Sequence, residues 1–291
     1  MLWGFQLEFM KGIRTKKLWA ILVIMLIFYV PVIYFMKQGN VTSEKEAIAV
    51  IINYVTDMAL LFLGILAIVF GAGAVNKEIE DGTIRIALSK SVTRLEYFLG
   101  KFLAQGLVLF LAIILTSAVT VTGLKWVGVG VGKIFTDVVL LNLLLLLVML
   151  EFIAIGYIMS AFIRSSGTSL GVALAVFFVI YLVIPAYVDY KIYVANEKMP
   201  REELGKIKED YYTKYLFFSP VAQLEVITDS TMKEVTKRVV SSHGVYESIS
   251  YEYVGLWNAM KTRAVNVMLM LAMTLVYLGI ATWRFLRMDL R

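Results

Sequence analysis

One acidic residue stands inside a long apolar run and could carry a proton or bind a cation. Glu151 follows VVLLNLLLLLVML, in a stretch that begins after Asp137 and ends before Arg164. A charge at the centre of a bilayer costs ~2.5–3.5 kcal/mol on insertion scales, and desolvation favours the neutral carboxylic acid. We expect Glu151 to face a bundle interior and to accept hydrogen bonds from Thr116 and Ser117. It either lines a translocation path with these hydroxyl groups or clamps neighbouring helices.

Other chemistries find little support in the sequence. There is no cysteine and one histidine, His243, which argues against thiolate and multi-histidine metal sites. GVGVGKIF at 128–135 departs from the phosphate-binding pattern GxxxxGK[ST], because the first glycine is misplaced and Ile134 replaces the hydroxyl residue. Glu202 and Glu203 lack a partner pattern, and no HExxH motif occurs. We therefore predict no enzyme activity, no metal site and no cofactor bound by this chain.

The elements that position Glu151 are membrane-spanning helices. The 291 residues are 60% hydrophobic and 17% charged, with a mean hydropathy of +0.79, whereas soluble domains are about 45–50% apolar and about 25% charged. A span needs ~20 apolar residues and must satisfy its own backbone hydrogen bonds, which favours helices. We predict an all-α polytopic membrane protein with six spans, at 18–36, 56–75, 102–123, 138–161, 167–188 and 264–286.

The distribution of Lys and Arg predicts the orientation of these spans. With both termini inside, the inner segments 1–17, 76–101, 162–166 and 284–291 carry 13 Lys and Arg, against 4 in the short outer loops 37–55 and 124–137. Cytoplasmic loops carry the excess of positive charge. We expect a multi-pass protein of the cytoplasmic membrane, with both termini cytoplasmic and 189–263 outside.

The segment 189–263 is predicted to form an extracytoplasmic cap. It holds 11 basic and 11 acidic residues and is rich in aromatics, unlike a disordered linker. A helix is expected after Pro200, and SPVAQLEVI is expected to form a short buried or interfacial segment. The domains are then 1–188, with spans one to five, the insertion 189–263, and 264–291 with span six. The cap either packs on the membrane surface or contacts a substrate or partner.

The charged segment 78–101 separates spans two and three. Apolar residues recur there at helical spacings of three and four, which indicates a helix with one apolar stripe. The stripe comprises Ile84, Ala87, Leu88, Val92, Leu95 and Leu99. Asp81 and Thr83 flank Gly82 and predict a turn before this helix. Such a helix lies on a membrane surface or docks into a partner.

This segment resembles the cytoplasmic signature of type-2 ATP-binding-cassette (ABC) transporter permeases. The residues that carry the resemblance are Glu78, Glu80, Gly82, Thr83, Leu88, Ser89, Arg94, Gly100 and Lys101. The family has a proline after the Leu-Ser pair, and Ser91 stands there. The N-terminal FQLEFMKGIRTKKLW is similar to the amphipathic interface helix of the family. FIRSSGTSLG is similar to its inner turn between spans four and five, and Ser219-Pro220 to the segment before span six.

The resemblance implies a function and partners. The segment 78–101 would be a coupling helix that docks into a separate ABC ATPase subunit, which binds ATP and Mg²⁺. The implied coupling residues are Glu78, Glu80, Gly82, Thr83, Arg85, Leu88, Ser89, Arg94 and Lys101. The permease would pair with a second copy or a paralogue in the lipid bilayer, with no nucleic-acid partner, and would export its substrate.

Two other functions remain open at this stage. In a secondary transporter driven by an ion gradient, Glu151 would carry the proton, although the two halves of the chain show no matching interrupted spans. In a mechanotransmission or membrane-anchor subunit, the ATPase would act without a transported substrate. A membrane-anchor subunit would carry the same sequence motifs as a permease. Only a transport assay in reconstituted vesicles distinguishes these two functions.

Overall fold

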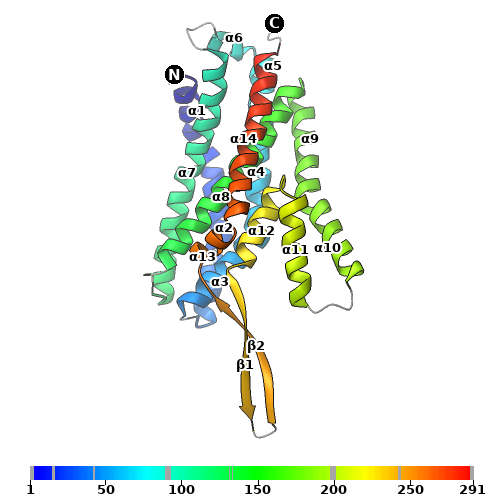
Figure 1. Cartoon of the computed structure of the whole chain (residues 1–291). Helices are drawn as coiled ribbons and strands as arrows, with labels where there is room; N and C mark the ends of the chain where they lie inside the picture. The colour runs from blue at the N-terminus through cyan, green and yellow to red at the C-terminus, as the bar shows by residue number, and fades with distance from the viewer. Residues whose placement is uncertain are drawn as a thin grey trace.

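The computed structural model describes residues 3–14, 17–41, 43–88, 93–130, 132, 134–196, 201–241 and 244–288. Ser89, Lys90 and His243 lie outside these residues, as does the side chain of Arg85. Figure 1 shows an elongated helical bundle with a long β-hairpin projecting from one end. The helix α1 and the last turn of α14 lie at the opposite end. We call that end the terminal end of the bundle, and the end with the hairpin the distal end.

The helices follow one another along the chain with short connections. Their bounds are α1 Trp3–Arg14, α2 Lys17–Gln38, α3 Glu44–Tyr54, η1 Val55–Ala59, α4 Leu60–Ala72, α5 Asn76–Glu80, α6 Thr83–Leu88, α7 Arg94–Val127, α8 Ile134–Phe162, α9 Ser166–Phe178, η2 Val179–Val183, α10 Ile184–Ala195, α11 Arg201–Tyr215, α12 Pro220–Asp229, α13 Leu256–Thr262 and α14 Ala264–Leu286. The segments η1 and η2 are single π-helical turns inside longer helices.

Six helices of the described chain are long and apolar enough to cross a bilayer, as predicted. They run over Leu18–Gln38, Leu60–Glu80, Arg94–Val127, Phe135–Phe162, Ser166–Ala195 and Ala264–Leu286. The all-α fold class is thereby confirmed for the membrane bundle. Span two has a longer helical approach than predicted, because α3, η1 and α4 form one continuous helix. Apolar residues such as Ile48, Ile51 and Ile52 of α3 are buried, and this burial stabilises helix where the sequence suggested a loop.

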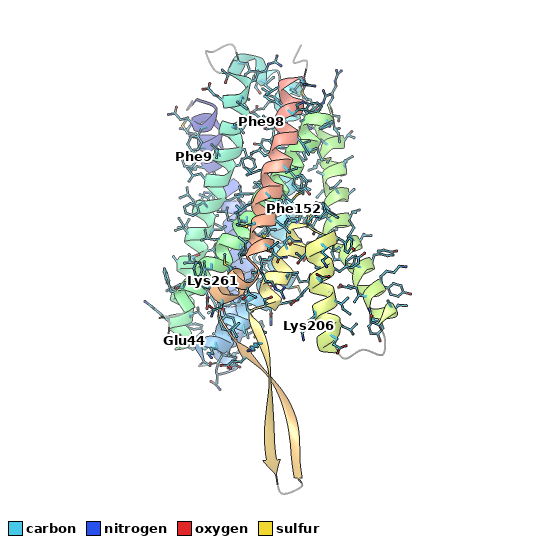
Figure 2. All side chains as sticks on the ribbon, in the orientation of Figure 1. Phe9, Glu44, Phe98, Phe152, Lys206 and Lys261 are labelled. Carbon is cyan, nitrogen blue, oxygen red and sulfur yellow. The ribbon has the colours of Figure 1, made fainter. Side chains whose placement is uncertain are left out.

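The helix α8 lies at the centre of the bundle and packs against α4, α7 and α14. Two glycines let α4 and α8 approach to backbone contact. A Cβ atom placed on Gly156 comes within 2.5 Å of the carbonyl oxygen of Ile68 and 2.7 Å of the amide nitrogen of Ala72. Gly71 faces the same contact from α4. Small residues at such positions are typical of packed transmembrane helices, and Figure 2 shows how side chains fill the rest of the bundle.

The predicted helix after Pro200 and the buried SPVAQLEVI segment are both present, as α11 and α12. They form a helical hairpin whose turn lies against the bundle (Figure 1). The side chain of Ser219 accepts a hydrogen bond from the amide of Ala222 and caps α12. Gln223 and Asn266 are buried and bonded to each other at 2.7 Å, and Tyr277 of α14 donates to the carbonyl of Phe218. The insertion therefore packs into the bundle at α12.

The β-hairpin was not predicted from the sequence. Strands β1 Met232–Ser241 and β2 Gly244–Tyr253 pair antiparallel, with Met232 opposite Tyr253. Alternating residues in VYESISYEY provided a period-two signal. The hairpin is fixed to the bundle at its base, where Lys45 of α3 pairs with Glu252 at 2.9 Å and Tyr253 is buried.

The prediction of one continuous amphipathic helix from residue 84 to residue 99 is wrong. The described part of α6 runs to Leu88, and α7 starts at Arg94. Thr93 has an extended backbone and forms a capping box with Glu96, in which each side chain accepts from the backbone amide of the other residue. This cap starts a new helix, so Leu95 and Leu99 belong to the first turns of span three.

Candidate functional site

A polar connection point lies between spans two and three at the terminal end of the bundle. It is built around α5, the short helix Asn76–Glu80. The hydroxyl of Ser160 on α8 accepts hydrogen bonds from the amides of Val75 and Asn76, at 2.8 and 3.2 Å, and donates to the Asn76 side chain. Asn76 and Ser160 are fully buried. The start of α5 is therefore fixed to the end of α8.

A buried ionic cluster fixes the middle of α5 to α7. The ammonium group of Lys101 lies 2.7 Å from the carboxylate of Glu78 and donates to the carbonyl of Ala74. Tyr97 donates its hydroxyl to Glu78 at 2.5 Å. The carboxylate of Glu8 on α1 lies 3.8 Å from Lys101 and accepts from Gln105. Lys101 and Glu78 are only 3% and 8% exposed, so each needs the other to compensate its desolvation.

The end of α5 is attached to α9 by Glu80. Its carboxylate accepts hydrogen bonds from the backbone amide and the hydroxyl of Ser166, the first residue of α9. An acidic group at a helix N-terminus satisfies free amides and complements the helix dipole. Ser169, one turn further, donates to the carbonyl of Ala72 at 3.0 Å. Thus α5 is bonded to α7, α8 and α9 through separate side chains.

A second contact joins the start of α7 to the end of α14. Arg94 donates to the carbonyl oxygens of Leu286 and Met288, at 3.4 and 2.9 Å. The predicted turn before α6 is also present, since Gly82 has a φ of +67°, and the Thr83 hydroxyl donates to the carbonyl of Glu78. Asp81, Gly82 and Thr83 are exposed. This exposed turn connects α5 to α6.

A hollow of about 510 Å³ opens beside this connection point. Its walls contain polar side chains, the opposite charges of Glu80 and Arg164, and several apolar side chains. The lining residues are Asn76, Ile79, Glu80, Ser160, Ile163, Arg164, Ser165 and Met288. They come from α5, from the end of α8 and the turn between α8 and α9, and from the end of the chain after α14. A side chain inserted here would contact three of the segments that join the spans.

The structure brings several predicted coupling residues together, but in two roles. Glu78 and Lys101 are buried and position helices, whereas Glu80, Gly82, Thr83 and Arg94 lie at the surface. Leu88 is half-buried, and the described part of Arg85 is its backbone. Sequence reasoning missed four partners, namely Glu8, Asn76, Ser160 and Ser166. For Glu8 the signal was available, because it is placed on the same face of α1 as Phe5, Phe9 and Gly12.

The predicted hydrogen bonds between Glu151 and the hydroxyls of span three are wrong. Thr116 donates to the carbonyl of Ala112 and to the sulfur of Met25. Ser117 accepts from Asn142 at 2.7 Å. In the described structure neither carboxyl oxygen of Glu151 has a hydrogen-bond partner, although the residue is 1% exposed. The hydroxyls are consumed within α7 and by Asn142, because helix rotation directs them away from residue 151.

Asn142 of α8 has a second polar partner, Tyr29 of α2. Tyr29 donates its hydroxyl to the Asn142 carbonyl oxygen at 3.0 Å, and both side chains are buried. Asn142 donates in turn to Ser117. This chain of three polar side chains joins α2, α8 and α7 inside the bundle. It satisfies groups that would otherwise be desolvated without a partner.

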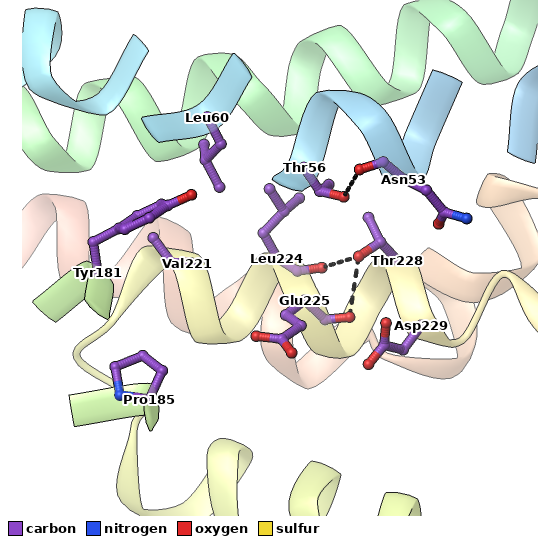
Figure 3. Close-up of a pocket in the computed structure, with 10 residues that line it drawn as sticks. All are labelled: Asn53, Thr56, Leu60, Tyr181, Pro185, Val221, Leu224, Glu225, Thr228 and Asp229. Atoms are coloured by element: carbon purple, nitrogen blue, oxygen red, sulfur yellow. Dashed lines mark hydrogen bonds between the residues drawn. The ribbon is translucent and has the colours of Figure 1, made fainter. Parts of the chain in front are cut away.

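On the distal side of the bundle, the helix α12 and the segments around the two π-helical turns line a hollow of about 270 Å³ (Figure 3). Thr56 of η1 and Tyr181 of η2 lie opposite Leu224, Glu225 and Thr228 of α12. Hydrogen bonds direct the hydroxyl protons of Thr56 and Thr228 to backbone carbonyls (Figure 3). The cap thus shares a partly polar hollow with spans two and five.

The charges beside this hollow are compensated. Lys208 of α11 lies 2.6 Å from Glu225 and 3.2 Å from Asp189. Burial by itself lowers the pKa of Lys208, but the two carboxylates outweigh that effect and hold this pKa above its usual value. Lys208 therefore stays charged at neutral pH and links α10, α11 and α12.

Comparison with known protein families identifies the family of the chain. The model of the ABC-2 family transporter proteins matches residues 2–290, nearly the whole chain. The chain belongs to this family. A probable ABC transporter permease protein, NosY of Stutzerimonas stutzeri, is 25% identical over 178 residues. That match covers 60% of this chain and 64% of the relative, which is less than two thirds of its length.

Family membership and the six apolar helices identify the chain as a multi-pass membrane subunit of an ABC transporter. In this family the ATPase activity belongs to a separate subunit. The predicted assignment to a non-enzymatic transport subunit is thereby confirmed.

Proposed function

We propose that this chain is the permease of an ABC exporter, driven by an ATPase that docks on α5, α6 and the start of α7. One observation carries the proposal above all. The exposed turn Asp81–Thr83 directly follows the helix α5, which is bonded to α7, α8 and α9 by buried or capping side chains. A displacement of the turn therefore moves three span helices together.

The proposed mechanism separates contact from transmission. Thr83, Leu88 and the exposed face of Glu80 and Arg94 contribute to the docking surface. Arg85 and Ser89 are assigned to this surface from the sequence alone. Glu78 and Lys101 act behind that surface and transmit its movement to α7, because a buried ion pair resists separation. ATP binding closes the ATPase subunits and shifts α5, and the bundle changes its accessible side. A second copy of the chain supplies the other half of the pathway.

The first test is affinity purification of the chain from its native membrane in mild detergent, with mass spectrometry of the bound proteins. We expect a stoichiometric subunit with a phosphate-binding loop. Charge reversal by Arg85→Glu or Arg94→Glu should reduce its recovery about tenfold, the scale of one charge-assisted hydrogen bond. The matched control is Lys125→Glu at the distal end, which should leave recovery unchanged.

Other outcomes of this purification favour a different function. If both reversed variants retain the ATPase fully, the docking surface is elsewhere. If the chain purifies alone even after crosslinking through Lys90, an ion-gradient transporter becomes the leading candidate. The observation that favours this second function is the unpartnered, buried carboxyl of Glu151. If the ATPase co-purifies with the chain but the complex transports no substrate in vesicles, the mechanotransmission role is favoured.

A second test addresses the orientation, in which we propose a cytoplasmic terminal end and an extracytoplasmic distal end. The chain contains no native cysteine, so single cysteines report without background. Lys125→Cys and Gly205→Cys should react with a membrane-impermeant maleimide in intact cells, and Lys90→Cys should react only after permeabilisation. The opposite labelling pattern contradicts the orientation.

A further inference from the structure

A large hollow of the described bundle lies far from the connection point around α5. It is an apolar groove of about 970 Å³ between α2 and the distal half of α7. The residues that line it are Leu18, Trp19, Leu22, Leu26, Val30, Ile33, Tyr34, Leu115, Thr116, Ala118, Val119, Thr122, Gly123 and Trp126. We call it the α2–α7 groove.

The shape of the groove follows from the sequence of its two walls. On α2 the lining residues recur every three to four positions along one face, and most of them are bulky. On α7 the floor contains smaller residues, Ala118, Thr122 and Gly123. On the terminal side of this floor α1 packs against α7, where Gly12 faces Val108. The helix α1 thus covers the surface of α7 on the terminal side, and the groove lies beyond it on the distal half of α7.

The distal mouth of the groove carries a positive charge. Lys37 lies on the last turn of α2, with its ammonium group 3.9 Å from the centre of the Trp126 ring. It also donates to the backbone carbonyl of Trp126 at 3.0 Å. Lys37 is exposed, so its ammonium group retains donors for an anionic group. Trp126 belongs to the groove wall, which places this cation at the mouth itself.

The length of the groove and the positions of its tryptophans match the dimensions of a phospholipid in a bilayer. Trp19 and Trp126 lie near the two ends of the groove and are both more than half exposed, and tryptophan is enriched at membrane interfaces. Leu18 to Tyr34 spans about 24 Å at 1.5 Å per residue, within a hydrocarbon core of about 30 Å. An acyl chain therefore lies fully within the groove when its phosphate reaches the level of Lys37.

We propose that the α2–α7 groove binds an anionic phospholipid, with one acyl chain along the groove and the phosphate on Lys37. A helix of a second copy fits the groove less well. Interfaces between transmembrane helices are enriched in small residues on both sides, whereas the α2 wall is bulky. A flexible acyl chain fills the narrow floor over Ala118 without such a requirement. The bound lipid then packs α2 against α7 and does not depend on an ATPase.

Two substitutions separate the headgroup from the chain. Lys37→Gln removes the charge and keeps the length of the side chain, and Lys261→Gln is its matched control, because Lys261 stacks on Trp257 outside the groove. Ala118→Phe fills the floor of the groove. Its control is Ala272→Phe, on an exposed position of α14.

The experiment is native mass spectrometry of the purified chain, titrated with phosphatidylglycerol or with phosphatidylcholine of the same acyl chains. We expect one phosphatidylglycerol to bind about fivefold more tightly than phosphatidylcholine, the contribution of one lysine near an anionic headgroup. Lys37→Gln should abolish this preference, because it weakens phosphatidylglycerol binding more than phosphatidylcholine binding. Ala118→Phe should weaken both lipids about tenfold, because it removes the apolar contact.

Three results would overturn the proposal. The first is equal lipid binding by Ala118→Phe and Ala272→Phe, which assigns the lipid to the general membrane surface. The second is a phosphatidylglycerol preference that survives Lys37→Gln, which assigns the phosphate to another cation. The third is a dimer that dissociates only in Ala118→Phe, which assigns the groove to a second copy of the chain.

Discussion

Replacing Lys101 by methionine is expected to cost about 3–5 kcal/mol of stability, the usual effect of leaving a buried charge without its partner. The substitution keeps the apolar stem and removes the ammonium group. Glu78 and Glu8 then lose the cation that lies 2.7 and 3.8 Å away, and the Ala74 carbonyl loses its donor. The measurement is the midpoint of denaturation of the purified chain in detergent.

A pair of controls distinguishes the ion pair from a packing effect. Lys125→Met removes an exposed lysine from the distal end of the same helix, α7, and should leave the midpoint unchanged. Glu78→Gln combined with Lys101→Met neutralises the closest pair and should recover much of the loss. Equal destabilisation in the single and double variants would show that the charge pair is not the cause. ATPase coupling should be lost with the single substitution if α5 transmits movement to α7.

Gly156→Val is expected to be the most disruptive change in the centre of the bundle. A Cβ atom at this position meets the backbone of α4, at 2.5 Å from the Ile68 carbonyl oxygen and 2.8 Å from the Cα of Gly71. Backbone atoms have no alternative rotamer, so α4 and α8 must separate. We expect about 3 kcal/mol of destabilisation and a loss of folded protein in the membrane.

The measurement is the yield of monodisperse protein after extraction, together with its denaturation midpoint. Gly171→Val is the matched control, because it makes the same substitution in a span helix where a Cβ meets nothing within 4 Å. Similar yields for the two variants would mean that α4 and α8 can separate without a large cost. The prediction concerns assembly and does not depend on the ATPase partner.

The sequence determined the architecture because its signals are local. Apolar runs of about 20 residues, the length that crosses the hydrocarbon core, predict spans, and all six are present. The helix after Pro200 and the Ser219 cap were also readable, because proline and serine act within one turn. The start of α7 was misread, since the apolar spacing continues through Val92 and Leu95. The competing signal was the capping box of Thr93 and Glu96, which fixes the start of α7.

Only the tertiary structure decided which polar residues meet. Glu78 and Lys101 are 23 positions apart, and the sequence marked both as coupling residues without showing that they form a buried pair. Glu8 and Ser166 join the same connection point from distant parts of the chain. The partners of Glu151 were predicted from depth alone, and depth does not specify the rotation of a helix about its axis. That rotation is set by packing, which directs Ser117 towards Asn142 and leaves the Glu151 carboxyl without a hydrogen bond.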